Sequence, residues 1–178
     1  MSRSSPCIGP HIGARGLGAA LVVCAYFTIP GAAARTFPIP PDRPVATIDV
    51  PDDWRPISIP DGVEGAAMNV KVRIAAEFIS APDLDAASAM ATAKLRQSGV
   101  MVGSETGRAA RRRLNGLDAL KIDYSGTDPN GESDITIILV AVPARAGFVA
   151  VCYWGEDEAQ ESVSNDLQSI AESVELAK

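Results

Sequence analysis

The stretch Arg111–Ile122, RRRLNGLDALKI, contains the strongest short-range signal for the fold. Asn115-Gly116 between two leucines is typical of a two-residue hairpin turn, because both central positions of that turn need a left-handed backbone that Asn and Gly adopt readily. Pairing outward from the turn predicts these facing residues: Arg113 with Asp118, Arg111 with Leu120, and Ala109 with Ile122. The sequence therefore predicts an antiparallel hairpin of fixed register.

The two faces of this hairpin differ in polarity. Leu120, Ile122 and Tyr124 fall on one face, which we expect to pack on the core. The opposite face is charged and we expect it to be solvated; its residues are Arg108, Arg112, Lys121 and Asp123.

Two apolar strands and a helix follow the hairpin. After the turn sequence Asp128-Pro129-Asn130-Gly131, the runs Ile135–Val142 and Phe148–Trp154 are apolar at nearly every position. Strands that are apolar on both faces are covered on both sides, so we expect these two in the middle of the sheet. A final helix starts at Glu156, and its apolar positions recur at helical spacing: Ala159, Val163, Leu167, Ile170 and Val174.

Three strands and a helix precede the hairpin. The strands are expected over Val45–Val50, Arg55–Ile59 and Ala66–Phe78, separated by Pro-Asp turns. The helix is expected after Ser80, its cap, with Gly99 as its stop. The full order is β-β-β-α-β-β-β-β-α, which predicts an α+β fold in which helices cover both faces of an antiparallel meander.

The first 34 residues have the composition of a secretion signal. A polar start with Arg3 and Arg15 precedes the uncharged apolar run Gly16–Pro30, and small residues lead up to Ala34. We expect cleavage after Ala34 and a secreted or periplasmic protein with no stable membrane span. Two alternatives stay open: a lipid anchor on Cys24, and an uncleaved N-terminal membrane anchor.

This interpretation divides the chain into three segments. They are a signal peptide over residues 1–34, a proline-rich extended lead-in over residues 35–44, and one α+β domain over residues 45–178. Ordered structure is expected to begin at Val45.

Removal of the expected signal peptide makes the chain more acidic. The full chain has 16 basic and 22 acidic residues and a net charge of −6. Residues 1–34 contain two of the arginines and none of the acids, so their removal lowers the net charge from −6 to −8. Such a balance argues against nucleic acid as a partner, because the phosphate backbone repels an acidic surface.

Processing also removes most of the catalytic side chains. His11 is the only histidine, and it leaves together with Cys7 and Cys24. Cys152 remains inside an apolar run, where we expect it to pack as a small hydrophobic residue. Without an imidazole or a second thiol, a catalytic triad, a zinc site and a thiol mechanism are all disfavoured. We therefore expect a protein that is not an enzyme and holds no cofactor.

Two groups of acidic residues have a simpler interpretation than a metal site or a catalytic pair. The segment from Asp128 to Asp134 places oxygen ligands at every second residue, through Asn130 and Glu132, but a calcium loop needs Gly and Glu where Ser133 and Leu139 stand. We interpret it as a turn and expect no metal. The carboxylates near Trp54 are likewise interpreted as turn formers and solubilising charges rather than an acid–base pair: Asp52, Asp53, Asp61 and Glu64.

Two features remain as candidates for binding. The basic run Arg111, Arg112 and Arg113 is either a solvated strand edge that discourages aggregation or a docking site for an acidic partner or an anionic envelope component. Trp54 either anchors the first strand in the core or stacks on a ligand.

The order of motifs resembles the PsbP-like superfamily, which also includes Ran-binding Mog-type proteins. The matching features are the turn Pro51-Asp52-Asp53-Trp54, the long Gly-containing hairpin meander, the aromatic strand end Val151–Trp154 and a closing helix that runs into Ser173–Leu176. The resemblance covers Val45–Leu176 and implies an accessory or binding protein without catalysis.

These observations predict an exported, non-enzymatic binding domain for a partner protein or a component of the cell envelope. The alternative is a carrier of a small ligand or a cation, with a cleft beside the sheet.

Overall fold

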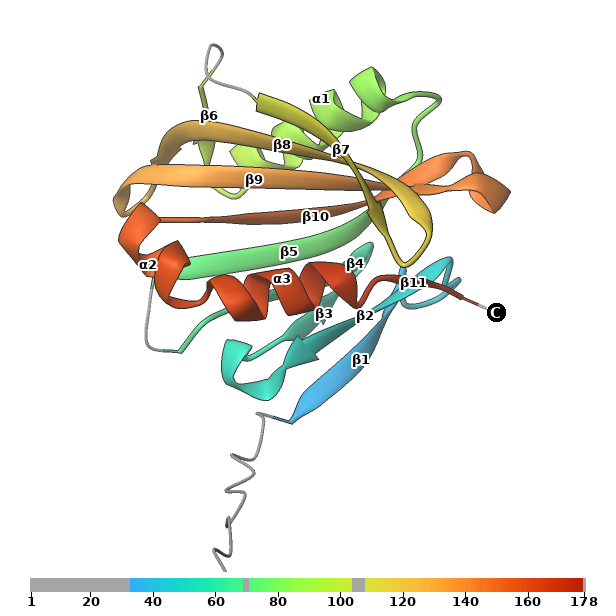
Figure 1. Cartoon of the computed structure of the whole chain (residues 1–178), viewed down its shortest axis with the longest axis horizontal. Coiled ribbons are helices and arrows are strands. Elements are labelled where there is room, and N and C mark those ends of the chain that lie inside the picture. Colours follow the sequence, from blue (N-terminus) through green and yellow to red (C-terminus); the bar gives the residue numbers. More distant parts are fainter. Residues whose placement is uncertain (1–32, 69–70, 104–107, 178) are drawn as a thin grey trace, which may run out of the picture. The chain divides into compact units, whose positions relative to one another are not determined.

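The computed structural model describes residues 33–68, 71–103 and 108–177 (Figure 1). The helices are α1 (Leu84–Gln97), α2 (Asp157–Ser162) and α3 (Ser164–Glu172), with two short 3-10 turns, η1 (Asp52–Trp54) and η2 (Pro143–Arg145). The strands are β1 (Ala34–Ile39), β2 (Ala46–Pro51), β3 (Ile57–Ile59), β4 (Gly62–Ala66), β5 (Val72–Ile79), β6 (Met101–Val102), β7 (Arg108–Leu114), β8 (Leu117–Asp128), β9 (Gly131–Val142), β10 (Gly147–Gly155) and β11 (Glu175–Leu176).

The strands form two antiparallel sheets. The large sheet has the order β3-β4-β5-β10-β9-β8-β6, and β7 pairs with β8 beside β6. The small sheet has the order β1-β2-β11. The prediction that Ile135–Val142 and Phe148–Trp154 lie in the middle is confirmed, because β9 and β10 are the central pair of the large sheet.

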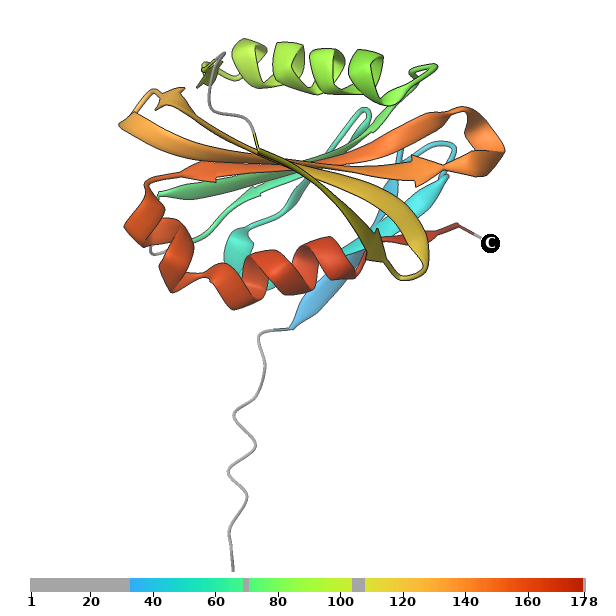
Figure 2. The same cartoon turned by 45° about the horizontal axis from the view of Figure 1, so that its top comes forward.

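Both faces of the large sheet are covered, which confirms the predicted α+β arrangement. Figure 2 shows α1 on one side of the sheet, with α2 and α3 on the other side. On the α1 side, Ile135, Ile137 and Leu139 pack with the small side chains of the helix. On the α3 side, Ile138 and Val140 pack with α3 and with the small sheet. Each face of the central pair thus contributes to its own core cluster.

The hairpin has the register that the sequence predicts. Arg113 lies opposite Asp118, Arg111 opposite Leu120, and Ala109 opposite Ile122. Asn115 and Gly116 both have positive φ, 48° and 79°, as the turn requires.

Helix α1 forms where it was predicted, but its cap differs. The carboxylate of Asp83, rather than Ser80, accepts a hydrogen bond of 2.8 Å from the backbone N–H of Ala86. Asp83 is the better acceptor because its charge also complements the positive end of the helix dipole. The helix ends at Gln97, and Gly99 follows with φ of 84°.

Three boundaries differ from the prediction. Ordered structure begins before Val45, because β1 starts at Ala34, runs into the proline-rich segment and pairs with β2 along its whole length. The strand expected over Ala66–Phe78 is two strands, β4 and β5, which pair with each other as a hairpin. The final helix is broken at Val163 into α2 and α3, and Val163 has a non-helical φ of −118°.

The expected signal peptide lies outside the described residues, apart from its last two. Among the helices of the described part of the chain, none is long and apolar enough to cross a membrane.

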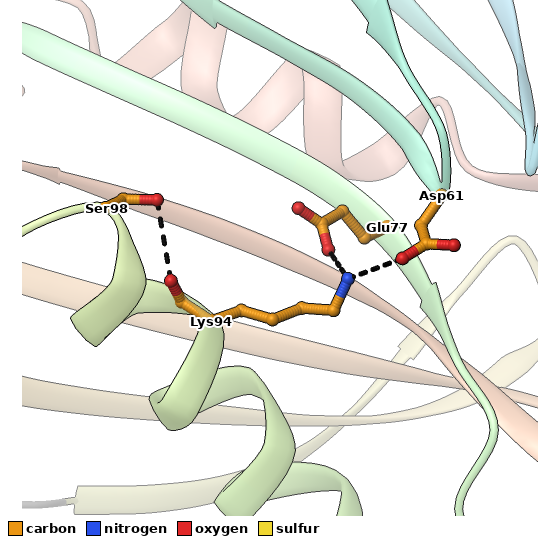
Figure 3. Close-up of polar contacts among 4 residues, drawn as sticks. All are labelled: Asp61, Glu77, Lys94 and Ser98. Carbon is orange, nitrogen blue, oxygen red and sulfur yellow. Dashed lines mark hydrogen bonds and ion pairs between the residues drawn. The ribbon is translucent and has the colours of Figure 1, made fainter.

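An ion-pair cluster around Lys94 ties α1 to the sheet (Figure 3). The Lys94 ammonium contacts Glu77 of β5 and donates a hydrogen bond of 2.7 Å to Asp61, in the turn between β3 and β4. Burial alone would lower the pKa of Lys94, but its hydrogen bonds to Asp61 and Glu77 and the charges of these residues raise it overall. The Glu77 side chain is only 17% exposed, so it depends on Lys94 for compensation.

We predict that Lys94→Met lowers the free energy of unfolding by about 1–3 kcal/mol at neutral pH, because Glu77 loses its counter-charge while remaining largely buried. The loss should shrink in strongly alkaline solution, where Lys94 deprotonates as the pH rises through its raised pKa. Urea denaturation measures both effects. The control is Lys71→Met, which removes an exposed ion pair with Glu156 and should cost less than about 1 kcal/mol. Equal losses in the two variants would contradict this role of Lys94.

Candidate functional site

A groove of about 790 Å³ lies between the large sheet and the α2–α3 segment. Its floor is formed by side chains of β8, β9 and β10, and its wall by one side of α2 and α3. The hairpin residues Arg112 and Leu114 also line it. The volume is within the range of about 300–1,000 Å³ that is usual for ligand sites.

The floor is polar at one end and apolar at the other. On β9 the residues that face α3 change from Asp134 and Thr136 to Ile138 and Val140. The hydroxyl of Thr136, although nearly buried, donates a hydrogen bond of 2.7 Å to Asp123 on β8. Asp123 also accepts from Lys121 at 2.9 Å. The predicted charged face of the hairpin therefore becomes part of the groove floor.

The wall is a stripe of polar residues at helical spacing. The groove-facing positions step by four, three, four and four residues, as one side of a helix does: Asp157, Glu161, Ser164, Gln168 and Glu172. The apolar side chains Leu167 and Ala171 lie beside this stripe and pack into the core. A helix that packed fully on the sheet would bury apolar residues at all these positions. The polar stripe therefore marks a surface that faces open space.

Two amide side chains fix the wall relative to the floor. Asn115, at the hairpin tip, donates hydrogen bonds of 2.6 Å and 3.0 Å to the carbonyls of Glu172 and Val174 at the end of α3. Gln160 in α2 donates hydrogen bonds of 2.6 Å and 2.9 Å to the carbonyls of Asp134 and Gly155. The groove is therefore held open by contacts near its two ends.

The groove is acidic. Two basic side chains line it, Arg112 and Lys121, against five acidic ones, which gives a net charge of −3; the acids are Asp123, Asp134, Asp157, Glu161 and Glu172. Partial burial raises the pKa of Asp134, and the neighbouring carboxylates of Asp157 and Asp123 raise it further. Asp134 and Asp157 thus form a like-charged pair at the α2 end of the groove.

The structure separates the three candidate arginines. Arg112 lies opposite Ala119 and lines the groove, whereas Arg111 and Arg113 point to the other face of the hairpin. Arg113 forms an exposed ion pair of 3.2 Å with Asp118. All three lie on β7, which pairs only with β8 among the described strands.

Trp54 is part of the core. Its side chain is only 1% exposed, and its Nε1 donates a hydrogen bond of 3.4 Å to Asp166 in α3. The nearby carboxylates have structural partners, since Asp52 pairs with Arg35 and Asp61 with Lys94. The interpretation of Trp54 as a core anchor is confirmed, and the buried ring presents no stacking surface.

The other candidates for reactivity or metal binding, Cys152 and the acidic segment that begins at Asp128, also have structural roles. Burial raises the pKa of the Cys152 thiol to about 12, and Cys152 packs in the core as predicted. The segment at Asp128 is a turn in which its carboxylate accepts a hydrogen bond of 2.6 Å from the backbone N–H of Asn130. Within the described residues, no group of three or more His, Cys, Asp or Glu side chains is arranged to hold a metal ion.

We predict that Asp134→Asn raises the melting temperature at pH 7 by about 1–3 °C. The native state holds the Asp134 proton more tightly than the unfolded chain does, so its contribution to stability is present in acid and is lost as the pH rises through the raised pKa. The gain in melting temperature from Asp134→Asn should therefore vanish near pH 3. Thermal melts across this pH range provide the measurement. Glu132→Gln, an exposed site on the same strand outside the groove, is the control. A gain that is independent of pH would contradict the proposed repulsion.

The comparisons with known proteins concern the fold. No family model and no curated protein gives a significant match to the sequence. LpqN of Mycobacterium tuberculosis, a protein involved in cell envelope biogenesis, aligns over 82% of this chain and 92% of its own, with a TM-score of 0.50 and 20% identity. The cyanobacterial PsbP of Synechocystis aligns over 84% of this chain and 96% of its own, with a TM-score of 0.53 and 10% identity. The yeast Ran-binding protein Mog1p, from Saccharomyces cerevisiae, aligns over 82% of this chain and 96% of its own, with a TM-score of 0.49 and 12% identity. The chain therefore shares its fold with LpqN and the cyanobacterial PsbP, which is the fold that the order of its motifs predicts.

Proposed function

We propose that this protein is an exported, non-enzymatic binding domain that holds a partner protein or a cell-envelope component in the groove beside α2 and α3. The observation that carries the proposal is the polar floor and polar wall that face each other across about 790 Å³. Surfaces that pack permanently against each other are apolar, so these two surfaces are suited to a ligand that supplies its own polar groups.

The residues of the groove favour binding over catalysis. Within the described residues no histidine lines the groove, and the single histidine of the sequence, His11, lies outside them. The remaining thiol, Cys152, is buried, with its pKa raised to about 12, and it does not line the groove. A nucleophile and its activating base are therefore not combined in this site.

Export is supported by the sequence before the domain. The apolar run Gly16–Pro30, followed by small residues up to Ala34, has the pattern of a cleaved signal. LpqN, which shares the fold, is a protein of cell envelope biogenesis, and a location at the envelope agrees with this interpretation. A chain that retained residues 1–34 at maturity would contradict it.

The groove also supports the second candidate, a carrier of a small ligand. Its volume suits such a ligand as well as it suits a protein segment. A small-ligand carrier should show a rise in melting temperature with compounds from an envelope extract. A partner-binding domain should instead retain a protein from the same extract.

The edge strand β7 offers a different docking place. Arg111 and Arg113 are exposed on the face of the hairpin away from the groove. An edge strand that carries arginines suits an acidic partner, but it equally serves to prevent aggregation. The groove is preferred because it offers a defined volume, whereas the edge is an open surface.

We predict that Ser164→Trp abolishes capture of the partner by the domain over residues 35–178, because the indole fills the middle of the groove. Affinity capture from an envelope extract measures this effect. The matched control is Asn165→Trp, the next residue on α3, which is exposed and outside the groove. Arg111→Glu/Arg113→Glu should leave capture unchanged. Loss of capture in this arginine variant, with capture retained by Ser164→Trp, would move the site from the groove to the β7 edge.

A further inference from the structure

We infer that the groove takes an extended segment of a partner protein that presents a basic side chain at the α2 end. This inference rests on the proposed function and specifies the chemistry of the ligand. It is carried by the way in which charge and apolar surface are distributed along the groove.

The α2 end of the groove presents carboxylates that form no ion pair with a basic residue of the groove lining, and the Lys71–Glu156 ion pair at the cap of α2 lies outside the groove. Asp134, at the start of the polar half of β9, and Asp157, in the first turn of α2, line the same end of the groove, where Gln160 of α2 donates a hydrogen bond of 2.6 Å to the Asp134 carbonyl. Glu161 lies one helical turn after Asp157 and lines the same groove. Neither basic residue of the groove neutralises this end, because Lys121 pairs with Asp123 and Arg112 lies near the hairpin tip. A guanidinium or an ammonium group is the complementary ligand.

The other end of the groove is lined by apolar side chains that are mostly buried. Leu114, Ile138 and Leu167 lie there between the hairpin and α3, and they are 9%, 6% and 5% exposed. Their edges and the half-buried ring of Tyr153 form a narrow apolar strip along the groove. A free polyamine carries no apolar side chain for this strip, whereas a peptide segment with one basic and one apolar side chain contacts both ends.

The length of the groove suits an extended chain. Ala119 lies opposite Arg112 near the hairpin tip, and Ser125 lies opposite Asp134. These two positions are six residues apart along β8, which corresponds to about 20 Å at the rise of a strand. A segment of about six extended residues would therefore reach from Arg112 to the acidic pair.

The ligand class can be tested with defined peptides. The probe is a fluorescein-labelled hexapeptide of alternating arginine and leucine, titrated with the domain over residues 35–178 and followed by fluorescence anisotropy. We expect binding that weakens with added salt, and a dissociation constant about tenfold higher for Asp134→Asn/Asp157→Asn. The matched control is Glu132→Gln/Glu158→Gln, which removes two charges from the same two elements outside the groove and should bind as the wild type does.

Three results would overturn the inference. They are equal affinity in the two double variants, tighter binding of the matching glutamate–leucine peptide, and full displacement of the probe by spermidine at equal charge concentration. If Ser164→Trp abolishes partner capture while the basic peptide fails to bind the wild type, the ligand class is wrong and the proposed function stands. If Ser164→Trp leaves both partner capture and peptide binding unchanged, the ligand class and the proposed function of the groove are both wrong.

Discussion

The structure depends on one constraint, which is that the central strands β9 and β10 are apolar on both faces and must be covered on both. The face toward α1 is completely covered, because Ile135, Ile137 and Leu139 are all buried beneath the helix. Toward α3 it changes along β9, from Asp134 and Thr136 to Ile138 and Val140. Helix α3 and the small sheet cover the apolar part, and the polar part remains open as the floor of the groove. The groove is thus a consequence of where the apolar pattern stops.

The groove keeps its shape because hydrogen bonds hold its two ends, in addition to the packing of Leu167 and Ala171 into the core. Asn115 serves two purposes, since it forms the hairpin turn and its side chain also binds the carbonyls at the end of α3. Gln160 joins α2 to the backbone of β9 and β10. A site that is formed before the ligand arrives loses less conformational entropy on binding. The acidic pair of Asp134 and Asp157 is a cost to stability, which is common where a residue serves binding.

Much of the fold could be predicted from the sequence because its signals are local. The Asn115-Gly116 turn fixes the hairpin register, and the apolar runs place β9 and β10 in the centre. The sequence leaves a cleft beside the sheet open as an alternative, but the residues that form the groove could not be predicted, because they depend on the break at Val163 and on how far α3 extends over the sheet. The polar side chains Asp157, Glu161 and Gln168 have the pattern of an ordinary solvated helix face. Their partner surface, Lys121 to Asp134, is distant in sequence, so no local pattern links the two.

The central claim is that ligands enter the groove and not the outer face of the hairpin. The most direct measurement is amide chemical-shift mapping by nuclear magnetic resonance of the isotope-labelled domain, with and without the captured partner. The account predicts that the largest shifts cluster on both sides of the groove, at Lys121, Thr136, Ser164 and Gln168. Shifts confined to β7 at Arg111 and Arg113, or to the exposed side of α1, would contradict it.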